Sequence, residues 1–122
     1  MLVELSVRYP GESMDTKPTN VVVVMVSTAN QEEAARIADL AVRSRLAACA
    51  SIIPTMFSTY WWEGKIANEQ EALILMKTTS DKISSLQEAI LTVHSYKVPE
   101  ILAIQVESGF QPYLEWVHRE VS

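Results

Sequence analysis

The chain has 122 residues with 48% hydrophobic and 20% charged side chains, which is ordinary for one soluble globular domain with its own core. Its formal net charge of -5 argues against nucleic acid or an anionic membrane as a partner, because both attract clustered Lys and Arg. With one cysteine, no internal disulfide and no apolar run near the roughly 20 residues of a membrane helix, we expect a reducing, cytoplasmic setting.

The first 19 residues are predicted to form a weakly ordered arm ahead of a single domain at residues 20–122. Pro10-Gly11 and Lys17-Pro18 interrupt this segment, and its apolar residues follow no helical or strand period. Chain termini without such a pattern usually fray.

The domain is predicted to begin with a strand and a helix. The β-branched run at residues 21–26 is typical of a central strand covered on both faces. Asn30 and Glu33 then form a capping-box pattern, in which each side chain satisfies a free backbone N–H at the helix start. Apolar residues recur at helical spacing from there to about Leu46.

One very long strand follows, at residues 48–62, with a proline in its middle. Pro54 predicts a bend or bulge, because proline is confined to edges and irregular places in a sheet. Gly64 supplies the backbone freedom for a turn within residues 63–68. The segment at 71–77, which is apolar from Ala72 to Met76, is the predicted returning strand.

The second half of the domain repeats the order of the first. Thr79 or Ser80 is placed to cap a helix whose apolar face runs to Val93. A loop at 94–99, a strand at 100–106 and a short helix beginning near Pro112 complete the chain. The order β-α-β-β-α-β-α predicts an α+β, ferredoxin-like domain with an extra C-terminal helix and a long β-hairpin arm.

The long strand predicts self-association. About 15 extended residues span about 50 Å, whereas a compact domain of this size is about 35 Å across. The far half therefore forms a projecting hairpin that exposes aromatic residues, namely Phe57, Tyr60, Trp61 and Trp62. Exposed aromatic surface and open strand edges favour coverage by another subunit. In the alternative, the strand breaks at Pro54 and these rings fold back on the helices.

Candidate chemistry is sparse. There is no Cys-x-x-Cys, His-Glu-x-x-His, calcium-loop or Gly-x-Ser-x-Gly pattern, and we expect no catalytic residues and no enzyme activity. Cys49, His94 and Glu100 suit copper or zinc by ligand type, although their spacing is scattered. In the alternative, Cys49 is a small buried hydrophobe and His94 ends a helix, where the dipole favours a cation.

Five motifs together resemble one known family. They are AACASIIP at 47–54, STYWWEGKI at 58–66, LMKTT at 75–79, HSYKVPEI at 94–101 and YLEW at 113–116. In this order they are similar to the CutA family of divalent-cation tolerance proteins, over about residues 21–117. The resemblance implies a ferredoxin-like homotrimer whose hairpins bind neighbouring subunits, and a role in binding copper or another divalent cation.

The resemblance also implies site residues. Cys49, His94 and Glu100 match the motif positions of the candidate metal ligands, and Trp62, Lys77 and Tyr96 would line the cleft between subunits. Because the family's architecture is similar to that of the trimeric PII signalling proteins, a sensor of a small anion or nucleotide is an alternative function. A third alternative is a structural trimerisation module.

One position departs from the family pattern. Where CutA proteins usually read His-Pro-Tyr, this chain has Ser95 between His94 and Tyr96. Losing the proline is expected to loosen the loop that positions His94.

Overall fold

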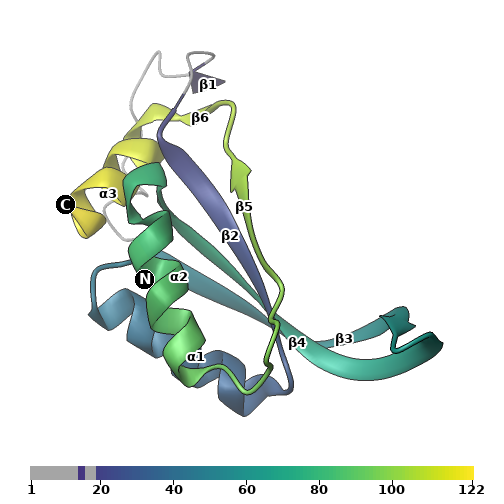
Figure 1. The fold of residues 1–122 in the computed structure, drawn as a ribbon. Helices are drawn as coiled ribbons and strands as arrows, with labels where there is room; N and C mark the ends of the chain where they lie inside the picture. The colour runs from purple at the N-terminus through teal and green to yellow at the C-terminus, as the bar shows by residue number, and fades with distance from the viewer. Residues whose placement is uncertain (1–13, 16–18) are drawn as a thin grey trace.

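The computed structural model describes residues 14–15 and 19–122 (Figure 1). The predicted N-terminal arm therefore lies almost wholly outside the described residues. The strands are β1 (Met14–Asp15), β2 (Val21–Thr28), β3 (Cys49–Trp62), β4 (Lys65–Thr79), β5 (Ile101–Gln105) and β6 (Gly109–Phe110). The helices are α1 (Gln31–Arg43), α2 (Ile83–Val93) and α3 (Gln111–Val121). None of these described helices has the length and apolar character needed to cross a membrane.

The main sheet has four antiparallel strands in the order β3-β4-β2-β5, and a short β1-β6 pair lies beside it. The two halves of the chain thus interleave, with the first strand of each half at the centre of the sheet. This order confirms the predicted ferredoxin-like α+β fold.

Helices α1 and α2 cover one face of the sheet (Figure 1). Val22, Val24 and Val26 alternate along β2 toward the helices, and none is more than 3% exposed. They pack with apolar residues of α1, α2 and β4, namely Ile37, Ala38, Ala41, Leu86, Ile90, Ile74 and Met76. This cluster is the core that holds the sheet to its helices.

The opposite face of the sheet is covered only at one end by the described residues. There Val21 packs with Leu114 and Val117 of α3. Val23 and Met25, which share that face, remain partly exposed. Within one chain, the predicted coverage of both faces of this strand is therefore complete at Val21 and only partial at Val23 and Met25.

The β3–β4 hairpin extends past the last pair between β2 and β4, Thr28 with Ala72, and projects as an arm at residues 56–71 (Figure 1). The register shifts between Ile53 and Met56, which places the predicted irregularity at Pro54. The turn contains only Glu63 and Gly64, with φ of 50° and 78°. Positive φ at both positions is typical of a two-residue hairpin turn, so β4 begins earlier than predicted.

The arm's aromatic rings do not fold back on the helices. Phe57 is 83% exposed and Trp61 is 73% exposed. By the pairing register, these two share one face of the arm, whereas Tyr60 and Trp62 share the other face with Glu71. The four aromatic residues predicted to form one subunit interface thus divide between two faces.

The helix starts differ in how they are capped. At α1 the predicted box forms in part: Asn30 accepts a hydrogen bond from the Glu33 N–H at 2.9 Å, but the Glu33 carboxylate accepts from Ala29 instead of Asn30. At α2 a 3-10 turn at Ser80–Lys82 precedes the helix, and the Thr79 hydroxyl bonds to Asp81. Pro112 lies in the first turn of α3, as predicted.

Candidate functional site

A pocket of about 330 Å³ lies between the root of the arm and the loop that joins α2 to β5. Its lining residues come from β2, the arm and that loop: Ser27, Tyr60, Trp62, Glu71, Tyr96, Lys97, Val98 and Glu100. Two walls that are far apart in sequence therefore meet here. Its volume is at the lower end of the range of about 300–1,000 Å³ that small-molecule sites occupy.

Glu71 and Tyr96 join these two walls. The Tyr96 hydroxyl donates a hydrogen bond of 2.7 Å to Glu71 Oε2, and Glu71 is only 8% exposed. Burial, together with the hydrogen bond to this carboxylate, raises the pKa of Tyr96. The phenol therefore stays a proton donor, and Glu71 is a buried carboxylate at the pocket wall.

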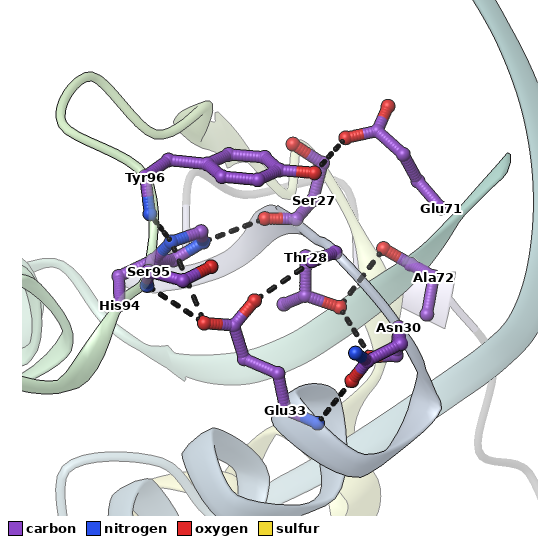
Figure 2. Close-up of polar contacts among 10 residues, drawn as sticks. Ser27, Thr28, Asn30, Glu33, Glu71, Ala72, His94, Ser95 and Tyr96 are labelled. Carbon is purple, nitrogen blue, oxygen red and sulfur yellow. Dashed lines mark hydrogen bonds and ion pairs between the residues drawn. The ribbon is translucent and has the colours of Figure 1, made fainter. Parts of the chain in front are cut away.

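The side chain of His94 is fully buried next to Tyr96, and both of its ring nitrogens are engaged (Figure 2). The Ser27 carbonyl oxygen accepts a hydrogen bond from Nε2–H at 2.7 Å, and Nδ1 accepts one from the Tyr96 N–H at 3.0 Å. A carbonyl cannot donate and a backbone N–H cannot accept, so His94 is the neutral tautomer with its proton on Nε2. In this state the imidazole positions the loop and has no free lone pair for a metal.

Glu33 ties the same loop to the start of α1 (Figure 2). Its carboxylate accepts hydrogen bonds from the Ala29 N–H at 2.9 Å and from the Ser95 N–H at 2.7 Å. The side chain is only 3% exposed, and Nδ1 of His94 lies 3.9 Å from Oε2. Burial by itself raises the pKa of Glu33. The backbone hydrogen bonds lower the pKa, and because the lowering effects together outweigh that of burial, the pKa falls below its ordinary value.

Comparison with known proteins identifies the family. The sequence model described as CutA1 divalent ion tolerance protein matches residues 22–120, which is most of the chain. The chain belongs to the CutA1 family. All the pocket and loop residues described above lie inside the matched range.

Two CutA relatives illustrate the extent of the sequence match. Protein CutA of Mus musculus is 40% identical over 110 residues, which are 90% of this chain and 62% of the mouse protein. The divalent-cation tolerance protein CutA of Thermus thermophilus is 40% identical over 95 residues, which are 78% of this chain and 92% of that protein. The chain thus spans less than two thirds of the mouse protein but nearly all of the bacterial one.

Solved CutA structures share the fold. CutA from Synechococcus elongatus has a TM-score of 0.84 at 30% identity, covering 90% of this chain and 96% of that one. CutA from Xylella fastidiosa has a TM-score of 0.83 at 33% identity, covering 85% of this chain and 100% of that one. The ferredoxin-like architecture is therefore the family's architecture.

The three predicted metal ligands of this CutA chain do not meet within one subunit. The Cys49 thiol contacts the Tyr113 hydroxyl at 3.6 Å. In the sheet, Cys49 of β3 lies opposite Lys77 of β4, which in turn lies opposite Val23 of β2. His94 bonds to Ser27, four residues further along β2, which is about 13 Å of strand. Among the described residues, no group of three or more His, Cys, Asp or Glu is arranged to hold a metal ion.

The predicted ligand cleft is assembled in part. Trp62 and Tyr96 line the pocket, and Glu100 lines it too. Lys77 does not: it lies on β4 opposite Cys49 and donates to the Ser51 hydroxyl at 3.3 Å. The sequence did not lead us to expect Glu71 or Tyr60 in the pocket. Tyr60 stands two residues before Trp62 on one strand, so both side chains share a face, and this spacing was the available signal for Tyr60.

Ser95 does more than replace a CutA proline. Its backbone N–H, which proline lacks, is one of the two donors that hold the buried Glu33 carboxylate. In this chain a hydrogen bond to Glu33 therefore ties the loop at the position of Ser95. The expectation that the loop is looser without the proline stays a prediction.

We expect Ser95→Pro to destabilise this chain even though it restores the family pattern. It removes a donor to a buried carboxylate, which is worth about 1–3 kcal/mol, against a gain of about 0.4–1 kcal/mol from the stiffer unfolded chain. Urea denaturation should give a lower free energy of unfolding than for Ser95→Ala, which keeps the N–H. Equal stability of the two variants would contradict the anchoring role.

The lowered pKa of Glu33 predicts acid lability. A carboxyl group whose pKa is lower in the folded than in the unfolded state stabilises the fold fully above its ordinary pKa, here 4.5, and loses that contribution as the pH falls through the folded value. The free energy of unfolding should therefore fall with pH below about 4.5. Glu33→Gln should show a flatter decline over the same range, and an unchanged slope would refute this assignment.

Proposed function

We propose that this protein contributes to divalent-cation tolerance by binding a cation, without enzymatic activity. In this proposal it assembles as a homotrimer and binds the cation in the pocket at the root of the arm. The family name supports the link to divalent cations. The observation that carries the proposal is Glu71, a carboxylate only 8% exposed that lines the pocket together with Glu100. A carboxylate held among aromatic rings attracts positive charge more strongly than a hydrated one.

The test is a calorimetric titration with Cu(II). The wild type should bind, and Glu71→Gln should weaken binding while keeping an oxygen that accepts from the Tyr96 hydroxyl. Glu88→Gln, which removes an exposed carboxylate from α2, is the matched control and should bind as the wild type does. Equal affinities in all three proteins would remove the pocket from the proposal.

Copper coordination by Cys49, His94 and Glu100 is a separate part of the proposal and requires donors from more than one subunit. Cys49 forms no disulfide and is a partly exposed residue, which supports its availability. Within one subunit the His94 nitrogens are engaged, so this residue would have to leave Ser27 or Tyr96. A Cys49→Ala variant with unchanged copper affinity would exclude the thiol.

The homotrimer is supported by the surface that one chain leaves open. Phe57 and Trp61 are exposed on one face of the arm, and Leu102 and Ile104 of β5 are 53% and 51% exposed. Such apolar surface favours burial against other subunits. Light scattering at micromolar concentration should give three times the 13.7 kDa of the chain. A monomeric mass would overturn the assembly.

A PII-like sensor of a small anion is the second candidate, favoured by Lys97. This side chain lines the pocket, is exposed, and forms no ion pair with the described residues. A nucleotide that raises the melting temperature of the wild type but not of Lys97→Gln would favour this candidate. If no ligand shifts stability, the structural trimerisation module remains. We place the protein in the cytoplasm as part of the same proposal.

A further inference from the structure

We propose that the pocket's own ligand is a small organic cation of the ammonium type. This inference rests on the proposed function only in taking the pocket as the ligand site. It goes further by naming the chemical class that the walls of a single subunit recognise.

The walls of the pocket are aromatic on two sides. Tyr60 and Trp62 lie on the same face of the arm, and Tyr96 lines the pocket from the α2–β5 loop. The Tyr96 ring is held by two contacts that fix its place, the hydroxyl bond to Glu71 and the N–H bond to His94. Aromatic rings on several sides of a small space are the usual means of binding an organic ammonium, through attraction between the cation and the ring faces.

Two carboxylates supply the opposite charge. Glu71 Oε2 accepts from Tyr96, while Oε1 has no partner among the described residues and Glu71 lines the pocket. Glu100 lines it from the loop side. Desolvation, together with the negative charges of Glu69 and Glu71, raises the pKa of Tyr60, in keeping with the carboxylates on this side of the pocket.

Within one subunit, this donor set does not by itself complete the ligand shell of a bare metal ion. A divalent metal requires four or more ligands at about 2–2.6 Å, whereas the described residues contain no group of three His, Cys, Asp or Glu so arranged. An organic cation needs no such shell, because ring faces and one or two carboxylates share its diffuse charge. A volume of about 330 Å³ also exceeds what a lone ion would fill.

The positive charge of Lys97 repels a cationic ligand, so replacing this residue tests whether the ligand is a cation or an anion. Its ammonium group is exposed at the pocket, so it remains hydrated while adding a repulsive charge. Removing it should strengthen the binding of an organic cation, whereas an anionic ligand would be weakened by the same change.

The experiment is a calorimetric titration of the full chain with tetramethylammonium chloride, at constant ionic strength held with sodium chloride. The neutral compound tert-butanol, which has the same number of heavy atoms, is the ligand control. We expect saturable binding of tetramethylammonium and at least about tenfold weaker binding of tert-butanol, because only the cation gains from the ring faces and Glu71.

Four variants locate the binding. Glu71→Gln should weaken tetramethylammonium binding about tenfold, Trp62→Ala about fivefold, and Lys97→Gln should strengthen it about twofold. Trp61→Ala removes the same ring from the opposite face of the arm and should leave the affinity unchanged, provided that light scattering gives it the same mass as the wild type. Thermal unfolding of each variant verifies that the fold is kept.

Several outcomes would overturn the inference: equal binding of the two probes, equal loss in Trp61→Ala and Trp62→Ala, or weaker binding in Lys97→Gln. If tetramethylammonium fails to bind while Cu(II) binding still depends on Glu71, the ammonium class is wrong and the pocket remains the proposed site. If Glu71→Gln changes the binding of neither cation, both the ligand class and the pocket are wrong.

Discussion

Replacing Glu33 by alanine is expected to lower the free energy of unfolding by about 2–4 kcal/mol, because it leaves two partly buried backbone N–H groups without their acceptor. One belongs to Ala29 before α1 and the other to Ser95 in the α2–β5 loop. Each unsatisfied donor in such a place costs about 1–3 kcal/mol. Urea denaturation at a fixed protein concentration measures the loss, since assembly would make stability depend on concentration.

Glu32→Ala is the control for this result. Glu32 lies in the same first turn of α1 but is exposed, so its loss removes only a favourable charge near the helix N-terminus, about 0.3–1 kcal/mol. Similar losses in the two variants would mean that water replaces the carboxylate of Glu33 and that the loop does not depend on it. A large difference would establish that α1 holds the pocket loop in place.

His94→Ala is expected to have a comparable effect, about 2–4 kcal/mol, with a consequence for the pocket. The change removes a fully buried ring and leaves the Ser27 carbonyl and the Tyr96 N–H without their partner. Tyr96 should then lose its fixed position against Glu71. His118→Ala, which alters an exposed residue of α3, should be nearly neutral in the same denaturation measurement.

This prediction also bears on how a copper experiment is interpreted. If His94 is a metal ligand in the assembled protein, His94→Ala should lose copper affinity while keeping most of its stability. If it positions the loop, stability and pocket binding should fall together. Full stability with unchanged binding of every cation would contradict both roles.

Much of the fold could be predicted because its signals are local. The β-branched run of β2, the helical spacing in α1 and the turn at Gly64 each act within a few residues. The bulge near Pro54 was predictable for the same reason, since proline removes a donor from the sheet wherever it stands. The family could also be recognised, because its motifs occur in order along the chain.

The site was less predictable because it depends on which strands pair and in which register. Glu71 lies next to an apolar run, and its charge would by itself predict a solvent-exposed side chain. In the structure it is buried, with the Tyr96 hydroxyl of the α2–β5 loop bound to it. Lys77 belongs to the family's motif but faces Ser51 and Cys49, away from the pocket. Cys49 and His94 are both suitable metal ligands by type. The strand register places Cys49 level with Val23 of β2, whereas His94 bonds to Ser27, four residues further along that strand.

By itself, the sequence determined the element order, the ferredoxin-like class, the projecting arm and the family. These follow from periodicity, turn chemistry and motif order, which are properties of neighbouring residues. Only the tertiary structure decided that His94 and Glu33 position a loop, and that Tyr60, Trp62, Glu71 and Tyr96 enclose one pocket. The physical reason is that this burial and these hydrogen bonds form between segments that are far apart in the sequence. No local pattern of neighbouring residues predicts which of those segments come into contact.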